Sequence, residues 1–561
     1  MTEKSEEQKT ASNFIRNIID GDLASGKMKH IVTRFPPEPN GYLHVGHAFA
    51  ALLSFTLSKE YQGSRFHLRF DDTNPEKEDM KYVKAIQEDL TWLGVDWGEH
   101  LYFASDYFDK LYEIATNLIK EGKAYVCSLS PEEVIEYRGT LTKPGKPSPS
   151  RDSSVEENLR LFSEMKEGKH KDGAMVLRAK IKMDSGNVHM RDPVLYRIRH
   201  VSHPRLKDKW CIYPNYDFTH CLSDAIESIT HSLCSIEFQD HRPLYDWIVE
   251  AAKMPHTPRQ YEFTRLNVNY TVTSKRKLKQ LVDEKHVSGW DDPRMPTLAG
   301  MRARGYPPAA VREFCRMLGV SRRESVIDIS LLEDCVRNLL NDSAKRAMAV
   351  LEPLKIHLTN YDKQEIFEVA NHPKRPELGT REVSFSKEIY IERSDFQENP
   401  EKKYFRLAPG KEVRLRGSYI IKCEKVVKDD DGAVIALHCS LDHDTLGKKP
   451  EGRKVKGVIH WVDGNNSEKV DITEYDRLFK SETPADDKEK GTTFLEHLNP
   501  GSKIEHKNCL IEKSLSKAAK GETFQFERLG YFFAKRDAQN QLKFTKVVSL
   551  RDSWAKAKGK S

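Results

Sequence analysis

Two histidines, His44 and His47, follow a short turn rich in proline and glycine. The turn separates an apolar run at 31–35 from another that begins at Leu43, an order that predicts a strand, a turn and a helix. Residues three apart share one face of a helix, so both imidazoles would lie at the helix N-terminus. Free N–H groups there attract anions, and Gly46 lets a ligand approach the backbone. The pattern indicates a cradle for a nucleotide triphosphate; the alternative is a capped helix with two surface histidines.

The sequence around this turn resembles a known family. The string RFPPEPNGYLHVGHA is similar to the first motif of class I aminoacyl-tRNA synthetases, in the form of the glutamyl/glutaminyl branch. The segment Val272-Thr273-Ser274-Lys275-Arg276 resembles the second motif, usually written KMSKS. The similarity covers nearly the whole chain and continues through RFDDTNP, EYRGTLT, KWCIYPNYDFTHC, HSLCSIEFQDHR, RQYEFTRLN and KHVSGWDDPRMPT. It is greatest to bacterial-type glutaminyl-tRNA synthetases, which implies an ATP-dependent ligase that joins glutamine to tRNA(Gln) through a glutaminyl-adenylate.

The resemblance implies an ATP site with three catalytic residues. His44, His47 and Lys275 would contact the phosphates and stabilise charge as pyrophosphate leaves, because adenylation needs positioning and charge stabilisation more than a protein nucleophile. Thr273 stands where relatives usually carry Met, and because Thr is smaller and polar we expect a difference in loop mobility or ATP affinity. We expect Mg²⁺ to enter with ATP, bound mostly by phosphate oxygens and water. The full set of expected ATP-binding residues is Glu38, Asn40, His44, Gly46, His47, Arg265 and Lys275.

The same resemblance implies an amino-acid pocket. Arg34 would hold the α-carboxylate, Asp71 would pair with the ammonium group, and Tyr216 would face the side-chain amide. A glutamate side chain needs a cationic partner, and Cys234 supplies no charge, so the pocket favours glutamine. The expected amino-acid-binding residues are Arg34, Asp71, Tyr216, Ser232, Cys234 and Gln260.

Contacts with tRNA are expected at two ends of the protein. At the acceptor end, Leu141 resembles an apolar wedge that separates the first base pair. Asp240 would read an acceptor-stem pair through the minor groove, accepting from a guanine amino group. Phe405 replaces a position that can be basic in relatives, which puts contacts there in doubt. The residues expected to bind splayed anticodon bases are Arg346, Arg406, Arg414, Gln525 and Arg528.

Two other functions are compatible with parts of the sequence. A glutamyl-tRNA synthetase would share the ATP motifs, so only the pocket distinguishes it. A non-catalytic tRNA-binding relative would be expected to lose phosphate or pocket residues, and Arg34, His44, His47, Asp71, Tyr216 and Lys275 are all present.

A structural zinc site is the alternative for four His and Cys side chains between residues 220 and 234. Such sites usually show closely spaced Cys or His pairs, whereas these four side chains are spread across a predicted helix at 222–229. We therefore expect no zinc and no other metal held by the protein alone. The four side chains are His220, Cys221, His231 and Cys234.

The composition is that of a globular protein with several domains. A chain of 561 residues is too long for one core. The longest apolar run, 48–57, is too short to span a bilayer, and the polar N-terminus lacks the apolar core of a secretory signal. Nine scattered cysteines indicate reduced thiols and a cytoplasmic location. We expect no membrane contact and, by resemblance, a monomer.

The order of elements predicts a multidomain α/β plus all-β fold. A Rossmann-type parallel sheet would position the motifs, because strands alternate with helices around them. Residues 501–561 carry 11 Lys and 3 Arg against 6 Asp and Glu, a balance of 14 − 6 = +8 that suits a phosphate backbone, although 555–561 are expected to be a solvated end. Short strands after about residue 348 indicate barrels or sandwiches. With the resemblance, the expected domains are an N-terminal helix (1–28), the first half of the sheet (29–105), an inserted acceptor-binding domain (106–210), the second half of the sheet (211–270), a helical connector with the second ATP motif (271–345) and two anticodon-binding β-barrels (346–561), the first of which the resemblance implies to be discontinuous in sequence.

Overall fold

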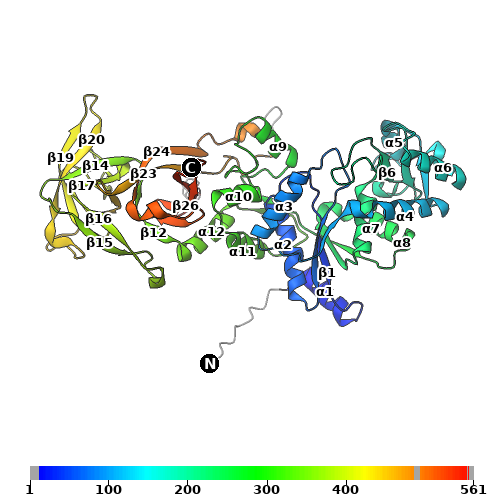
Figure 1. Ribbon diagram of the computed structural model, residues 1–561, viewed down its shortest axis with the longest axis horizontal. Coiled ribbons are helices and arrows are strands. Elements are labelled where there is room, and N and C mark those ends of the chain that lie inside the picture. The colour runs from blue at the N-terminus through cyan, green and yellow to red at the C-terminus, as the bar shows by residue number, and fades with distance from the viewer. Residues whose placement is uncertain (1–11, 486–492, 553, 555–561) are drawn as a thin grey trace.

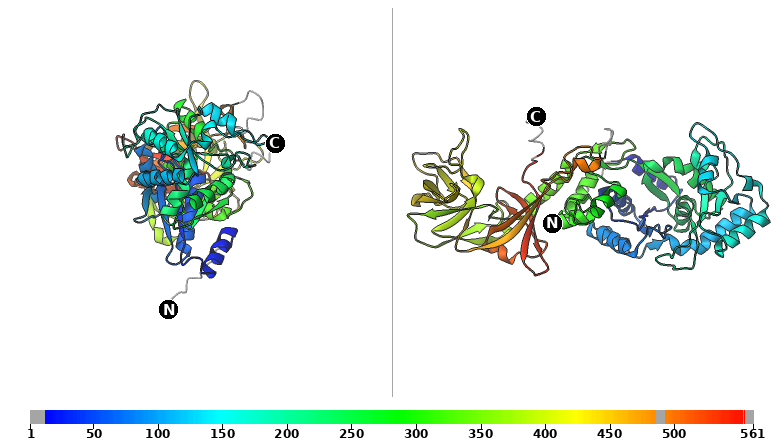
Figure 2. Two further views of the ribbon diagram at one scale, coloured as in Figure 1. Left: turned by 90° about the vertical axis from the view of Figure 1, so that its right-hand side faces the viewer. Right: turned by 90° about the horizontal axis from the view of Figure 1, so that it is seen from above.

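The molecule is elongated, with helices and a parallel sheet at one end and barrels at the other (Figures 1 and 2). It was studied as a computed structural model, which describes residues 12–485, 493–552 and 554. The N-terminal segment MTEKSEEQKT and the basic tail 555–561 lie outside the described residues. The connector helices lie between the two ends, so any ligand that touches both must run along the long axis.

A parallel sheet carries the first sequence motif. Three of its strands pair in the order β1-β2-β3, and two more pair as β8-β9. The backbone N–H of Thr230 donates to the carbonyl of Val32 at 3.0 Å, which sets β8 on the free side of β1. The resulting order, β3-β2-β1-β8-β9, confirms the predicted Rossmann-type sheet. The strands are β1 (Val32–Phe35), β2 (Arg65–Phe70), β3 (Leu101–Phe103), β8 (His231–Ser235) and β9 (Arg259–Phe263).

Helices cross between these strands and cover them. The helix expected from Leu43 is present and begins two residues later, at Val45. The helices of this part are α1 (Phe14–Ala24), α2 (Val45–Glu60), α3 (Met80–Trp92), α7 (Tyr216–Ile226) and α8 (Arg242–Ala251).

The segment between the two halves of the sheet forms an antiparallel sheet of its own, in the order β4-β5-β6-β7. Its core is shared with the second half, since Phe162 and Leu177 belong to one buried cluster with Phe218 of α7 and Ile248 of α8. The insertion is therefore anchored on the same helices that carry part of the site. Its elements are α4 (Phe108–Lys120), β4 (Ala124–Cys127), α5 (Pro131–Arg138), α6 (Val155–Lys166), β5 (Val176–Ala179), β6 (Val194–Ile198) and β7 (Ile212–Pro214).

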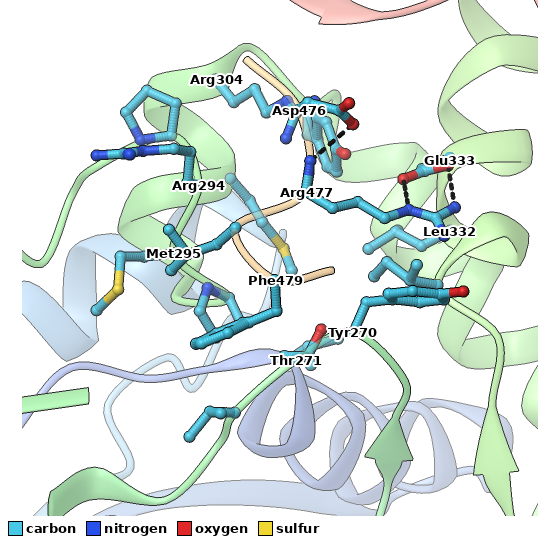
Figure 3. Close-up of a pocket in the computed structure, with 18 residues that line it drawn as sticks. Tyr270, Thr271, Arg294, Met295, Arg304, Leu332, Glu333, Asp476, Arg477 and Phe479 are labelled. Atoms are coloured by element: carbon cyan, nitrogen blue, oxygen red, sulfur yellow. Dashed lines mark hydrogen bonds and ion pairs between the residues drawn. The ribbon is translucent and has the colours of Figure 1, made fainter. Parts of the chain in front are cut away.

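The connector is helical, as the sequence predicts, and 290–296 interrupts it. A cavity of about 60 Å³ lies where the connector meets the barrels (Figure 3). Arg477 crosses it, donating to the carboxylate of Glu333 at 3.1 and 2.9 Å, with its guanidinium 4.7 Å from the ring centre of Tyr270. The connector elements are β10 (Asn267–Val268), α9 (Lys275–Asp283), α10 (Leu298–Arg304), α11 (Pro308–Leu318), β11 (Val326–Ile327) and α12 (Ser330–Ser343).

Two nearly closed, seven-stranded barrels follow, which confirms the predicted all-β part. The barrel next to the connector is discontinuous in sequence, as expected, because the other barrel is inserted after its second strand. Its strands are β12 (Lys345–Ala347), β13 (Ala349–Val350), β23 (Ser467–Tyr475), β24 (Lys503–Glu512), β25 (Thr523–Phe526), β26 (Gly530–Arg536) and β27 (Leu542–Val548).

The inserted barrel lies at the far end of the molecule (Figure 1). The extended segment 458–462 is divided at His460, where the chain changes partner from β18 to β17. Met348 does the same in the first barrel, between β12 and β13. The far barrel consists of β14 (Pro353–Leu358), β17 (Glu388–Glu392), β18 (Glu412–Leu415), β19 (Ile420–Lys428), β20 (Val434–Asp442), β21 (Val458–Ile459) and β22 (Trp461–Asp463), with a hairpin of β15 (Glu365–Ala370) and β16 (Thr380–Phe385) beside it.

Candidate active site

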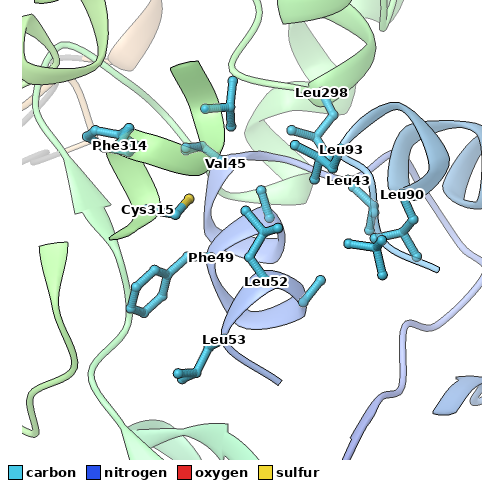
Figure 4. Close-up of a cluster of buried hydrophobic side chains, with 14 of the residues drawn as sticks. Leu43, Val45, Phe49, Leu52, Leu53, Leu90, Leu93, Leu298, Phe314 and Cys315 are labelled. Carbon is cyan, nitrogen blue, oxygen red and sulfur yellow. The ribbon is translucent and has the colours of Figure 1, made fainter. Parts of the chain in front are cut away.

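Helix α2 is fixed by burial on most of its surface. Phe49, Leu52 and Leu53 pack into a cluster with side chains of α3, α10 and α11, as Figure 4 shows. A helix that is apolar on most sides needs neighbours on most sides, and here it has the sheet and the connector. The N-terminus of α2 points to the crevice between β1 and β8, where the strand order reverses. In such sheets, ligands bind outside the carboxyl ends of the strands at that point.

The two histidines form a capping box at the start of α2. Nδ1 of His44 accepts from the backbone N–H of Gly46 at 3.1 Å, and Nδ1 of His47 accepts from the backbone N–H of His44 at 3.2 Å. A neutral imidazole that accepts at Nδ1 carries its proton on Nε2. The cap therefore turns each ring into a donor at Nε2, with the ring centres 3.9 Å apart.

Both rings are neutral at physiological pH. Burial lowers the pKa of His47 to about 4, with further lowering by Lys275 and Arg265. Burial also holds the pKa of His44 well below its usual range, helped by His47 and the same two cations. The site therefore offers uncharged N–H donors from the histidines and positive charge from elsewhere.

Lys275 supplies charge at the same place. It begins α9, and its Nζ donates to Oδ1 of Asn40 in the turn of the first motif. The side chain crosses Gly41 closely, and a Cβ there would force the end of the Lys275 side chain to shift. Burial lowers the pKa of Lys275 to about 8. Arg265 lies beside it, with a guanidinium nitrogen 3.5 Å from Oγ1 of Thr273.

The six predicted amino-acid-binding residues converge at the ends of β1, β2, β8 and β9. Asp71 follows β2, and its carboxylate accepts from Nε of Arg69 at 2.8 Å. Burial alone would raise the pKa of Asp71, but the charge of Arg69 outweighs it and the pKa is lowered. Asp71 is thus a fixed anion at the edge of the crevice, and Nδ1 of His220 lies 3.1 Å from its second oxygen.

Arg34 is placed beneath this crevice, with 1% of its surface exposed. Its guanidinium donates to Asp224 at 3.1 Å and to the carbonyl of Leu233 at 2.6 Å, and it also donates to Ser232. A substrate carboxylate would have to replace one of these partners. The role expected for Arg34 stays a prediction, and its contacts favour support of Ser232 from below.

The other pocket residues lie on neighbouring elements. The ring of Tyr216 stacks on His220, with centres 4.9 Å apart. Cys234 on β8 is paired in register with Glu262 on β9. Burial raises the pKa of Cys234 to about 12, so its thiol is neutral. Gln260 donates from Nε2 to Glu262 at 3.2 Å, and Arg242 pairs with the same carboxylate at 3.2 Å. The two cations near Cys234, Arg34 and Arg242, are thus already paired with Asp224 and Glu262.

Sequence reasoning missed the charged residues that hold the pocket together. Arg69 and Asp224 are buried and join at 2.8 Å, and both touch predicted pocket residues. An arginine between Leu68 and Phe70, in the interior of the strand RFHLRF, was a usable signal, because a buried charge needs a partner. Asp224 gave no such signal, since a carboxylate on a helix is commonly exposed.

The two predicted acceptor-end residues lie on the insertion and next to it. Leu141 is 80% exposed at the tip of the turn that follows α5. Arg191 fixes this turn by donating to the carbonyls of Arg138 and Thr140 at 3.0 and 2.8 Å. Asp240 is exposed, and its carbonyl accepts from Asn187 at 2.7 Å.

Four of the five predicted anticodon residues lie in two groups. Gln525 on β25 belongs to one group, and Arg528, which follows β25, belongs to the other. Arg528 and Arg406 both pair with the buried carboxylate of Asp395, at 2.7 and 3.0 Å. Arg346 on β12 is opposite Gln525 on β25. Nε of Arg346 and Oε1 of Gln525 are buried without a hydrogen-bond partner among the described residues, and their contact with a base stays a prediction.

Arg414, the fifth, behaves differently. Its guanidinium donates to the carbonyls of Ser418 and Thr445 at 3.0 and 2.8 Å, and to that of Lys448. It therefore holds the segment after β20 against β18, and direct contact with a base stays a prediction.

The described part of the chain contains neither a metal-binding cluster nor a membrane-spanning helix. There, no three His, Cys, Asp or Glu side chains gather closely enough to hold a metal ion. No helix in the same residues has the length and apolar character needed to cross a bilayer.

Comparison with known proteins gives a match along the whole chain. Residues 30–342 match the catalytic domain of class I tRNA synthetases (E and Q), and 344–442 and 458–535 match two anticodon-binding domains of the same family. A glutamine–tRNA ligase of Stutzerimonas stutzeri is 57% identical over 98% of this chain and 99% of its own. One of Pseudomonas putida is 57% identical over 97% and 96%. A crystal structure of a glutamate tRNA ligase from Elizabethkingia meningosepticum is 20% identical, covers 56% of this chain and 70% of its own, and has a TM-score of 0.42.

Proposed function

The chain belongs to the class I tRNA synthetases of the glutamate and glutamine branch, and we propose that it joins glutamine to tRNA(Gln) with ATP, through a glutaminyl-adenylate. The observation that carries this conclusion is the identity of 57% over 98% of the chain to a glutamine–tRNA ligase. The crevice described above supplies the chemistry that such a reaction needs.

In the first step, an oxygen of the glutamine carboxylate attacks the α-phosphorus of ATP, and the bond to the pyrophosphate oxygen breaks. The Nε2–H groups of His44 and His47 donate to phosphate oxygens, and Lys275 neutralises charge on the leaving pyrophosphate. Preorganised donors lower the barrier because they need no reorientation when charge develops. Glu38, Asn40, Gly46 and Arg265 complete the proposed ATP site.

In the second step, a hydroxyl of the terminal tRNA ribose attacks the acyl carbon and releases AMP. The insertion (106–210) is proposed to hold the acceptor end, with Leu141 as the wedge and Asp240 at the stem. The barrels (346–561) are proposed to hold the anticodon through Arg346, Arg406, Arg414, Gln525 and Arg528. The elongated shape supports this division, because the two ends of a tRNA are far apart.

Selection of glutamine is proposed to follow from the charge of the pocket. Asp71 pairs with the substrate ammonium group, and Tyr216 offers a hydroxyl that both donates and accepts, as an amide requires. Cys234 is neutral, and the nearby Arg34 and Arg242 are already paired with Asp224 and Glu262. A glutamate side chain would therefore be buried without a free cation, which is unfavourable.

Mg²⁺ is proposed to accompany ATP. Since the described residues contain no cage of three ligands, the ion would be held by phosphate oxygens and water, a mode that suits Mg²⁺. When bound, the ion would add positive charge beside the phosphates. We also propose that the protein acts as a monomer in the cytoplasm, which is consistent with its nine free cysteines.

ATP–pyrophosphate exchange tests the proposal. Glutamine and glutamate are compared side by side, with tRNA(Gln) present, because activation in this family is expected to need the tRNA. Exchange that depends on glutamine is the expected result. Equal exchange with glutamate would indicate the glutamyl branch, and no exchange with either would indicate a non-catalytic relative.

A further inference from the structure

One exposed aromatic ring lies beside the proposed anticodon residues. Phe405 is 52% exposed, and no other Phe, Tyr or Trp of the described residues is as exposed. It directly precedes Arg406, which pairs with Asp395. A single exposed apolar residue needs no explanation by itself. The surroundings of this ring, however, give it the properties of a binding surface.

The backbone under the ring is held firmly. A Cβ on Gly457 would lie 1.9 Å from the carbonyl oxygen of Phe405, so the two segments touch and only glycine fits. Leu407, two residues on, is buried, and its N–H donates to the carbonyl of Asp395 at 3.0 Å. Phe405 is thus presented on a fixed backbone, which reduces the entropy lost when a ligand binds.

A basic segment lies beside the ring. Nζ of Lys456 lies 4.7 Å from the centre of the Phe405 ring, and Arg453 of the same segment is paired with Glu412 and Asp442. Arg414 fixes the start of the segment 446–456 by donating to the carbonyls of Thr445 and Lys448. That segment has one acidic residue, Glu451, and five basic ones: Lys448, Lys449, Arg453, Lys454 and Lys456.

An exposed aromatic ring in a basic surface is the arrangement by which proteins hold single-stranded nucleic acid, because bases stack on the ring while cations track the phosphates. We propose that Phe405 is a stacking platform for one unpaired base of the anticodon loop. This inference rests on the proposed function and adds to it a contact made through the face of a base, where the arginines and Gln525 would read edges. A protein ligand would instead need acidic groups around an apolar anchor, and unchanged tRNA binding by Phe405→Ala would favour it.

The test measures the dissociation constant of the full-length protein for tRNA(Gln) between 50 and 200 mM salt. Phe405→Ala should weaken binding about 5- to 100-fold, the range for loss of one stacked base, with an unchanged slope of log K against log salt. Phe405→Trp should bind as well as the wild type. Lys456→Ala should instead reduce the slope by about one, because it removes a phosphate contact. Ile435→Ala, an exposed side chain of the same barrel at 48%, is the matched control and should have no effect.

RNAs with an abasic nucleotide at each anticodon position, one at a time, locate the contact. The effect of Phe405→Ala should vanish with one of these RNAs and persist with the others. The inference is overturned if Phe405→Ala binds like Ile435→Ala, if its effect persists with every abasic RNA, or if it lowers the salt slope as Lys456→Ala does. These outcomes leave the proposed function intact when the wild type binds and charges tRNA(Gln). Failure of the wild type to do so would overturn the proposed function itself.

Discussion

Nδ1 of His47 accepts the backbone N–H of His44 across 3.2 Å, three residues back along the chain. This bond uses the side of the imidazole that faces the helix and fixes the proton on the other nitrogen. His44 is fixed in the same way by the N–H of Gly46. The helix cap and the proposed phosphate site are therefore one structure, and a change that breaks the cap also reorients the donors.

The buried histidines should make stability depend on pH. The pKa of His47 is about 4 in the folded protein, against about 6.5 in an unfolded chain. Between these values the unfolded chain binds more protons, so stability is present above pH 6.5 and is lost as pH falls toward 4. Between pH 7 and pH 5, the free energy of unfolding should fall by about 1–2 kcal/mol less in the His47→Asn variant than in the wild type. Urea unfolding at both pH values measures this, and equal losses in the two proteins would refute it.

Lys275 should set the alkaline limit of activity. Its pKa of about 8 means that the free enzyme loses this charge as pH rises through 8. The kcat/KM for ATP, which reports the free enzyme, should fall above that pH, and Lys275→Arg should move the fall upward. Lys275→Ala should raise the activation free energy of adenylation by about 3–4 kcal/mol, which is far more than its effect on the free energy of glutamine binding. Near-normal single-turnover aminoacylation by the Ala variant would contradict this role.

Cys234→Arg should shift the choice of amino acid toward glutamate by supplying a cation at the side-chain end of the pocket. Because Glu262 is paired in register with Cys234, it would partly neutralise the new charge. The double variant with Glu262→Gln should therefore shift further. Aminoacylation of one tRNA with each amino acid gives the ratio of kcat/KM values, and Cys234→Ser is the control of similar size. No relative gain for glutamate would show that Cys234 does not line this pocket.

Leu141 should matter only when the first base pair of the acceptor stem is closed. Leu141→Ala should lower kcat/KM for the normal tRNA, and a tRNA with a mismatched first pair should restore most of the loss, since the unpairing energy is already supplied. Ile135→Ala on the neighbouring helix α5, 61% exposed, is the matched control. An equal loss on both tRNAs would point to a general binding contact instead.

Arg414→Ala should impair tRNA recognition without slowing the chemistry. Arg414 lies in the far barrel, and its removal would break the hydrogen bonds that hold the segment starting at Thr445 and Lys448. We expect a cost on the order of 1–3 kcal/mol in kcat/KM for tRNA, by analogy with a lost base contact. A minihelix without an anticodon should be charged equally by both proteins, and an equal loss on it would exclude this explanation.

The sequence by itself determined the local elements and the family. The strand, turn and helix around the two histidines follow from periodicity and turn residues, which act over a few positions. The pattern of short strands indicated barrels or sandwiches, and the resemblance implied two barrels. The expected sheet and barrels were confirmed, because backbone hydrogen bonding and side-chain alternation are local properties. The roles of the ATP-site residues stay predictions.

Only the tertiary structure decided how distant segments meet. It brought Lys275 to Asn40, placed Arg69 and Asp224 together beneath the pocket, and gave Arg34 partners inside the chain. It also revealed that each barrel changes strand partner at a single residue, Met348 or His460. Sequence periodicity cannot specify such contacts, because they depend on which buried charges find partners and on how strands far apart in the chain pack against one another.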